Sequence, residues 1–143
     1  MHHILIPVEA GHDGRTQSAV AQAAQLHHSE ASIVHLLRVQ PQVSGHVAAY
    51  FDPREMHELQ IEWADEALQP AKMLLERAGV PFDCTVKVGQ SAKTIAQTAR
   101  DLGCDRVIFG EQPVGLAERL FGSLAQQVRH LLHSQGDPVV IGS

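Results

Sequence analysis

The chain has 143 residues, of which 44% are hydrophobic and 19% are charged, and its formal net charge is -5. This length favours one domain, residues 1–143, with a core large enough to fold without disulfides or metals. A mean hydropathy of -0.09 argues against a disordered chain and against a membrane protein. The negative charge argues against nucleic acid as a partner, because nucleic acid selects basic surfaces.

The apolar segments and the cysteines favour a soluble, cytoplasmic protein. The apolar run from Ile4 to Val8 is far shorter than the roughly 20 residues of a membrane-spanning helix, and no secretory signal pattern accompanies it. Cys84 and Cys104 have a spacing that matches no metal or redox motif, so we expect two reduced, packed thiols.

Ten histidines raise the question of a metal site. The pairs His2-His3 and His27-His28 are adjacent in the sequence, and adjacent side chains point in different directions on a strand or a helix. His130 and His133 could share a ligand on one helical face, but isolated pairs lack the ligand number of a structural site. We therefore predict that the protein binds no metal.

Short strand-like segments alternate with longer helix-like segments five times, which is typical of βαβ units around a parallel sheet. A first strand is predicted over residues 3–8, and a helix with a face of small apolar side chains over 15–28. Residues 32–39 begin with Ser32 and are then apolar except at His35 and Arg38, as expected of a second strand that is covered on both faces.

Residues 40–51 have no periodicity and form the one long loop of the sequence, and long loops are often functional. Asp52, Pro53 and Glu55 then mark a helix start: Asp52 caps, Pro53 takes the first helical position and Glu55 reaches back to the cap. Pro70 should kink or interrupt this helix because it removes an internal hydrogen bond, and Gly79 should end it. The side chains expected to be buried are Met56, Leu59, Trp63, Ala67, Leu74 and Leu75.

The second half of the chain continues the alternation. Residues 82–88 alternate apolar and polar positions, which predicts a strand near a sheet edge with one exposed face. Ser91 is expected to cap the next helix. A fourth strand (105–110), a helical pattern (116–131) and a fifth strand (137–141) follow. We therefore predict an α/β fold with a doubly wound, five-stranded parallel sheet and helices on both faces.

The candidate site lies in the loops that follow strands one, two and four, residues 9–14, 39–45 and 110–115. In an open parallel sheet, ligands bind beyond the carboxyl ends of the strands where the winding direction reverses. The last of these loops leads to Gly122-Ser123 at the head of the final helix, where free N–H groups and the helix dipole favour an anion. Simpler explanations exist: Gly110 ends a strand, Ser123 is an N-cap and Glu9 is a solvated carboxylate.

Three segments of the sequence resemble strands of the universal stress protein family. HILIPVE at 3–9 resembles the opening strand of the family, GCDRVIFG at 103–110 resembles the fourth strand, and DPVVI at 137–141 resembles the last strand. Their order and spacing extend the resemblance over nearly the whole chain. The resemblance implies strand order 3-2-1-4-5 and a cytoplasmic regulatory protein. It also implies a homodimer through antiparallel pairing of the last strand, here Val139, Val140 and Ile141. Some family members bind ATP and others do not.

The glycine motif of the ATP-binding members is matched only in part. Their pattern is Gly, two residues, Gly, nine residues and Gly-Ser or Gly-Thr; Gly110 and Gly122-Ser123 match its ends, and Gly115 matches a further common glycine. The segment between Gly110 and Gly122 is one residue short, which is up to ~3.5 Å of reach. Pro113, which lacks an N–H donor, or Gln112 replaces the second glycine. Glu111 adds a negative charge, and no Lys or Arg occurs between residues 110 and 117.

The nucleoside end of the implied site falls on the first two strands. Glu9 stands where the family has an aspartate that contacts the nucleoside of ATP, and Val39 matches the position whose main chain meets adenine. The full candidate pocket for ATP or a related nucleotide consists of Pro7, Val8, Glu9, Val39, Gly110, Gly115, Gly122 and Ser123. We expect a regulatory domain whose nucleotide pocket is altered.

Two other functions fit the same sequence. A protein-interaction module without a small ligand would use the loop 40–51 and an acidic helix face, although such a charge run is usually only a solvated surface. That face consists of Glu55, Glu58, Glu62 and Asp65. A slow nucleotide hydrolase is less favoured, because the sequence has no nucleophile elbow, no phosphate-binding Gly-Lys-Ser/Thr and no paired carboxylates at a strand end. We therefore expect no enzymatic activity.

Overall fold

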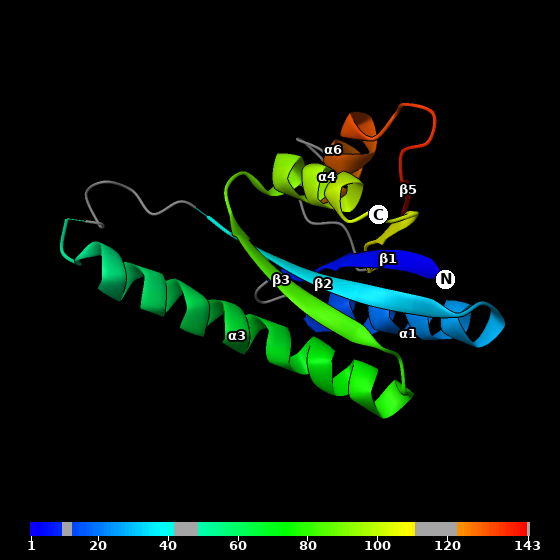
Figure 1. Ribbon diagram of the computed structural model, residues 1–143, viewed down its shortest axis with the longest axis horizontal. Coiled ribbons are helices and arrows are strands. Elements are labelled where there is room, and N and C mark those ends of the chain that lie inside the picture. Colours follow the sequence, from blue (N-terminus) through cyan, green and yellow to red (C-terminus); the bar gives the residue numbers. More distant parts are fainter. Residues whose placement is uncertain (10–12, 42–48, 111–122, 143) are drawn as a thin grey trace.

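The computed structural model describes residues 1–9, 13–41, 49–110 and 123–142. Five parallel strands form one sheet in the order β3-β2-β1-β4-β5. The elements are β1 (His2–Pro7), α1 (Asp13–Ser29), β2 (Ser32–Gln40), α3 (Pro53–Ala78), β3 (Phe82–Val88), α4 (Ser91–Asp101), β4 (Arg106–Ile108), α6 (Leu124–Leu131) and β5 (Val139–Ile141). Helices α1 and α3 cover one face of the sheet, and α4 and α6 cover the other (Figure 1). The predicted fold class and strand order are confirmed.

The core consists of two layers that share the central strand β1. Ile4 and Ile6 pack with Leu68 and other residues of the α1/α3 layer, whereas Leu5 packs with Ile95 and the α4/α6 layer. All three β1 side chains are fully buried, because alternate residues of a strand point to opposite faces and both faces are covered here. β1 pairs with β2 along its whole length, while β4 and β5 have three residues each.

Helix α3 has the predicted cap residue, first residue and end. The Asp52 carboxylate accepts a hydrogen bond from the Glu55 N–H at 2.8 Å, Pro53 is the first helical residue, and Gly79 ends the helix with a φ of 70°, which favours glycine. The prediction that Pro70 could interrupt the helix is wrong, because α3 is one continuous helix of 26 residues. Buried side chains anchor it on both sides of Pro70, and this packing outweighs one lost hydrogen bond.

The buried stripe of α3 differs from the predicted one. Its fully buried members are Ala64, Leu68, Ala71 and Leu75, of which only Leu75 was expected. Trp63 was predicted to be buried, but it is 48% exposed. The amino-terminal half of α3 extends past the ends of the strands (Figure 1), so it has little sheet to pack against.

Strand β3 lies at one edge of the sheet, as predicted. Its apolar positions are less covered than its alternation suggested, since Val86 and Val88 are both exposed. Cys84 on this strand is exposed too, which corrects the expectation of two packed thiols; Cys104 is buried. An edge strand has a neighbour on one side only, and this leaves its side chains accessible.

Two further predictions concern the second half of the chain. Ser91 does not cap α4: the cap residue is Gln90, whose side chain makes no capping hydrogen bond, and Ser91 is the first helical residue. The predicted helical pattern over 116–131 is observed as α6 from Leu124 onward, and its earlier part lies outside the described residues. None of the described helices combines the length and the apolar character needed to cross a bilayer.

Candidate functional site

The carboxyl ends of β1, β2 and β4 meet at one edge of the sheet because these strands are parallel neighbours. A small cavity of about 20 Å³ lies there, and a second of about 10 Å³ lies beside it. Pro7, Val8, Glu9 and Val39 line the first cavity, and Pro7, Glu9 and Gly110 line part of the second. The structure thus brings five predicted site residues together. The predicted Gly115 and Gly122 lie outside the described residues.

Glu9 forms an ion pair with one arginine at this edge and interacts electrostatically with a second. Arg15 in the first turn of α1 places its Nη1 atom 3.5 Å from a carboxylate oxygen of Glu9, and both side chains are largely buried. Arg38 near the end of β2 donates a hydrogen bond from Nη1 to the Val8 carbonyl oxygen at 3.2 Å. Glu9 is therefore a paired carboxylate and not a freely solvated one.

Arg38 keeps hydrogen-bonding capacity at the site. Its Nε atom is buried and has no hydrogen-bond partner among the described residues. Burial lowers the pKa of the Arg38 guanidinium, and the negative charge of Glu9 opposes this shift. Arginine remains protonated in proteins, so Arg38 supplies a positive charge where the sequence suggested only negative charge.

Sequence reasoning missed both arginines, although each left a signal. Arg38 interrupts an otherwise apolar strand, and a charge in such a place needs a local partner. Arg15 lies in the first turn of α1, where the helix dipole disfavours a cation. Neither signal identifies Glu9 as the common neighbour, since that contact depends on the strand order.

Ser123 is the N-cap of α6, and Gln126 completes a capping box. The Ser123 hydroxyl accepts a hydrogen bond from the Gln126 N–H at 3.1 Å, and the Ser123 N–H donates to the side-chain oxygen of Gln126 at 3.1 Å. Ser123 is only 5% exposed. The explanation of Ser123 as an N-cap is correct, and any anion at this amide must displace the Gln126 side chain.

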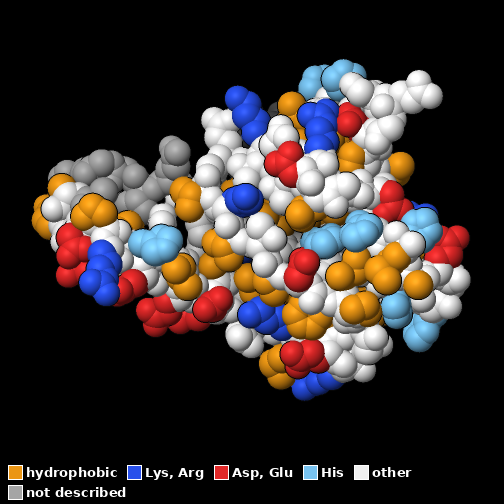
Figure 2. All heavy atoms as spheres, viewed as in Figure 1, with side chains coloured by type: hydrophobic (Ala, Val, Ile, Leu, Met, Phe, Trp, Pro, Cys, Tyr) orange, Lys and Arg blue, Asp and Glu red, His pale blue; other side chains and the backbone are white. Residues whose placement is uncertain are grey.

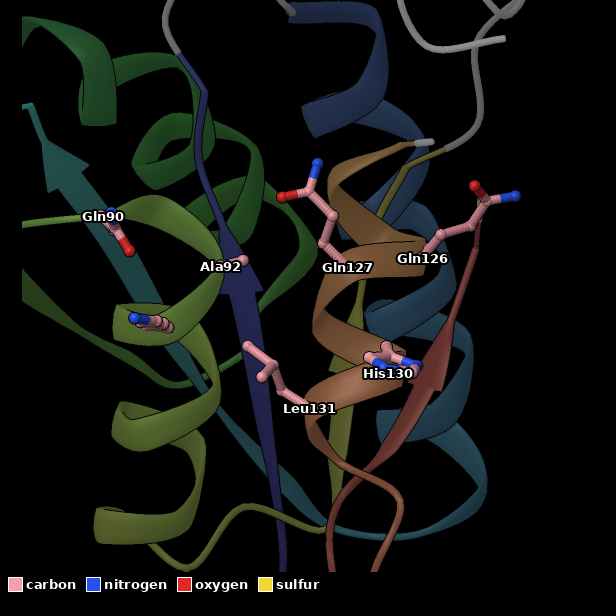
Figure 3. A pocket seen from close by; sticks show the side chains of 7 residues that line it. Gln90, Ala92, Gln126, Gln127, His130 and Leu131 are labelled. Atoms are coloured by element: carbon pink, nitrogen blue, oxygen red, sulfur yellow. The ribbon is translucent and has the colours of Figure 1, made fainter. Parts of the chain in front are cut away.

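A larger hollow of about 460 Å³ lies between α4 and α6 (Figure 3). It was not anticipated from the sequence. Gln126 borders it and also caps Ser123, whereas Gln127 leaves α6 in a different direction and faces α4. The residues around it are Gln90, Ala92, Lys93, Gln126, Gln127, His130 and Leu131.

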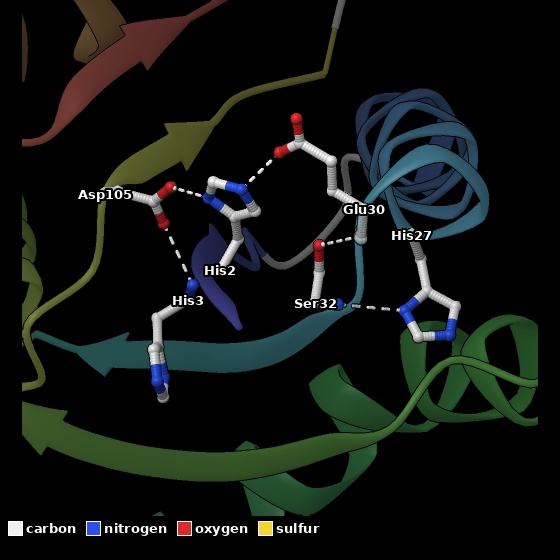
Figure 4. A network of polar contacts seen from close by, with 6 residues as sticks. All are labelled: His2, His3, His27, Glu30, Ser32 and Asp105. Carbon is white, nitrogen blue, oxygen red and sulfur yellow. Dashed lines mark hydrogen bonds and ion pairs between the residues drawn. The ribbon is translucent and has the colours of Figure 1, made fainter.

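The amino ends of the strands carry a network of histidines and carboxylates (Figure 4). His2 lies between the carboxylates of Asp105 and Glu30 and contacts both. The His3 N–H donates to Asp105 at 2.9 Å. Burial by itself would raise the pKa of Asp105, but hydrogen bonds from His2 and from backbone N–H groups outweigh it, and the pKa is lowered.

A second part of this network crosses three strands. His35 on β2 is hydrogen-bonded to Asp83 on β3 at 2.7 Å and to His3 on β1 at 2.9 Å. Over the described ranges, no three side chains of metal-binding type come together to hold an ion. These histidines join the strands of the sheet through carboxylates and through one another.

Comparison with known proteins adds to this geometry. The model of the universal stress protein family matches residues 1–139. Three solved structures are similar over 99% of this chain. The hypothetical protein MJ0577 has 24% identity, 95% of its own chain covered and a TM-score of 0.72. The universal stress protein from Archaeoglobus fulgidus in complex with dAMP has 18% identity, 97% of its own chain covered and a TM-score of 0.66. A family member from Arabidopsis thaliana with AMP bound has 16% identity, 92% of its own chain covered and a TM-score of 0.64. No curated protein matches the sequence.

Proposed function

Because the chain belongs to the universal stress protein family, we propose that it is a regulatory protein that binds an adenine nucleotide beyond the carboxyl ends of β1, β2 and β4. The observation that carries this proposal is the match in fold, over 99% of the chain, to proteins solved with dAMP and with AMP. Glu9 and Val39 line the same cavity as Leu124, the first residue of α6. One ligand there can therefore contact the strand ends and the last helix together.

The proposed pocket is altered in its charge and in its size. Arg15 pairs with Glu9, and Arg38 interacts with it electrostatically; the two supply positive charge, which residues 110–117 lack. The cavities that the described residues line measure about 20 and 10 Å³, whereas ligand pockets are typically some 300–1,000 Å³. The described residues therefore enclose only a small part of the space that a nucleotide needs.

Two measurements on the purified protein test the proposal. The protein is first denatured, and the supernatant is analysed for released nucleotide. Nucleotide-free protein is then titrated calorimetrically with AMP and with ATP and magnesium. We expect binding of at least one of the two nucleotides. Protein that releases no nucleotide and gives no heat with either would refute the proposal.

A matched pair of arginine variants locates the ligand. Arg38→Gln removes the cation beside Glu9, and the loss of one charge-assisted hydrogen bond should weaken nucleotide binding by about 10-fold or more. Arg54→Gln removes a cation of the same kind from the exposed start of α3 and should leave binding unchanged. Equal effects of the two variants would place the nucleotide elsewhere.

We further propose that the protein is a cytoplasmic homodimer in which β5 pairs with its copy in the partner. β5 lies at the edge of the sheet opposite β3, and Val139 on it is 62% exposed. A short edge strand with an exposed apolar side chain offers backbone groups for pairing with a second chain.

A nucleotide-independent interaction module is a second candidate function. The observation that favours it is the exposure of Trp63 and Ile61 on the amino-terminal half of α3, where Figure 2 shows acidic side chains gathered along the helix. Exposed tryptophan beside charged residues is typical of protein-binding surfaces. Absence of nucleotide binding in the titrations above would favour this candidate over the first.

A further inference from the structure

We infer that the amino-terminal half of α3 is a docking surface for a basic, partly apolar segment of another protein. This inference rests on the second candidate function and names the chemistry of its partner; it does not involve the nucleotide site at the carboxyl ends of the strands. The α3 docking surface consists of Phe51 and of the side of the helix that carries Glu55, Glu58, Leu59 and Glu62.

A hollow of about 300 Å³ lies on the α3 docking surface. Phe51 and Leu59 supply its apolar lining, and its other lining side chains are the carboxylates of Glu55, Glu58 and Glu62. Residues three or four apart share one side of a helix, so Leu59 and the three carboxylates form a single stripe. The volume is at the lower end of the ~300–1,000 Å³ range of ligand pockets, which suits a few side chains of a partner.

Large apolar side chains near the stripe are open to solvent. Trp63 follows Leu59 by one helical turn and is 48% exposed, and Phe51 is 38% exposed. Figure 2 shows hydrophobic and acidic side chains side by side over this half of α3. Exposed apolar surface that is rimmed by polar residues marks sites of protein contact, and tryptophan is enriched among the residues that dominate such contacts. The surface is therefore suited to a protein partner.

The charge of the stripe decides which partner fits. Among the residues that the structure describes, Glu55 and Glu62 have no ion-pair partner, and Glu58 is paired only with Arg54, at 3.5 Å and with both side chains mostly exposed. An exposed pair of this kind contributes little, so the stripe remains negative. Nucleic acid and anionic lipid surfaces are repelled by it, and a second copy in a two-fold contact would oppose the same carboxylates.

A segment that carries arginine or lysine beside apolar side chains matches both parts of the surface. A guanidinium group binds carboxylates through two parallel hydrogen bonds and also stacks on aromatic rings. Glu55 and Phe51 line the same hollow, so one arginine can use both. Apolar side chains of the segment then pack against Leu59, and the complementary charges exclude acidic partners.

Trp63 reports contacts at this surface, because it is the only tryptophan of the chain. Covering its indole ring shifts the emission to shorter wavelength. The probes are two panels of short peptides without tryptophan that share the same Leu and Phe positions. One panel carries Arg and Lys at its other positions, and the second carries Asp and Glu. We expect only the basic panel to give a saturable shift, with an affinity that falls as the salt concentration rises.

Matched double variants assign the contact to the stripe. Glu55→Gln with Glu62→Gln removes two charges from the hollow, and the loss of two exposed ion pairs should weaken the binding of basic peptides by about 2- to 30-fold. Glu76→Gln with Asp101→Asn removes two charges from exposed residues outside the hollow and should leave binding unchanged. Thermal melts verify that both double variants are folded.

A shift with the basic panel that only the first double variant weakens supports the inference. Equal weakening by both double variants, an equal response to both panels, or an equal shift with spermine, which has charge without apolar side chains, overturns it. A shift with the acidic panel alone overturns the basic partner and leaves the second candidate function intact. No shift with either panel overturns the inference together with the interaction surface on which it rests. The nucleotide titrations remain a separate test, because they concern a different site.

Discussion

Gly110 and Arg15 approach each other so closely that a Cβ atom on Gly110 would stand 1.6 Å from the Arg15 carbonyl oxygen. The obstacle is backbone, in the first turn of α1, and it does not yield as the end of a flexible side chain would. The position after β4 therefore requires glycine, because the backbone of α1 leaves no space for a side chain there.

Gly110→Ala should lower the free energy of unfolding by about 3 kcal/mol or more, because the added methyl group forces α1 away from the sheet. Urea denaturation measures the loss. Gly79→Ala is the matched control: Gly79 has a φ of 70° but open space around it, so only backbone strain of about 1 kcal/mol is expected. Similar losses in the two variants would mean that α1 adjusts freely.

The two cysteines should differ sharply in reactivity. Burial raises the pKa of Cys104 to about 12, so this thiol forms almost no reactive thiolate near neutral pH. Cys84 is exposed, and although burial of its sulfur also raises its pKa, nearby Lys72 opposes that shift. At pH 8, mass spectrometry after iodoacetamide treatment should show one modification on the native chain and two on the unfolded chain.

Cys84→Ser provides the control for this assignment, since the native variant should then remain unmodified over the same period. Two modifications on the native wild type would contradict the buried position of Cys104.

Asp105 should contribute to stability in a pH-dependent way. Its pKa is lowered in the folded protein, so its contribution is complete above the unfolded value of about 3.9 and is lost as the pH falls through the folded value. The side chain is 41% exposed, and solvent screening limits the effect to below about 1 kcal/mol. Between pH 5 and pH 3, the wild type should lose more stability than Asp105→Asn does.

Asp101→Asn is a suitable comparison for Asp105, because it makes the same substitution at an exposed residue of α4. Urea midpoints at several pH values would reveal the difference. An acid sensitivity of Asp105→Asn equal to that of the wild type would show that the contacts with His2 and His3 do not favour the charged form.

The proposed dimer can be tested at its edge strand. Val139→Lys places a charge on β5, and burying that charge against its copy in the partner would be costly, so sedimentation should detect a monomer. Val86→Lys makes the same change on β3, at the opposite edge, where Val86 is 39% exposed; this variant should remain a dimer. A monomeric wild type, or a dimer lost only with Val86→Lys, would contradict pairing through β5.

The fold could be predicted from the sequence because its signals are local. The apolar run of β1 and the helix start at Asp52-Pro53 are each contained in a few residues, and the structure confirms them. Trp63, Pro70 and Ser91 were misjudged because packing decides them: the helix that carries Trp63 extends past the sheet, and buried residues on both sides hold it together at Pro70.

The candidate site was predictable in its position but not in its chemistry. Parallel strands bring Pro7, Val39 and Gly110 to one edge, and strand order alone implies this. The ion pair of Glu9 with Arg15 and the hydrogen bond of Arg38 to the Val8 carbonyl oxygen join separate elements, and no local pattern encodes them. The capping box of Ser123 and Gln126 could be predicted from the sequence, since a serine followed three residues later by glutamine is its usual signature.

The strands in the two halves of the sheet differ in length. β1, β2 and β3 pair over most of their length, whereas β4 and β5 contribute three residues each. Amide hydrogen exchange should therefore be slowest in β1 and β2 and faster in β4 and β5, where a local opening breaks fewer hydrogen bonds. The half with the shorter strands carries the edge proposed for assembly and ends in Gly110 at the candidate site, so pairing of two chains there would slow the opening motions of the region proposed to bind the nucleotide.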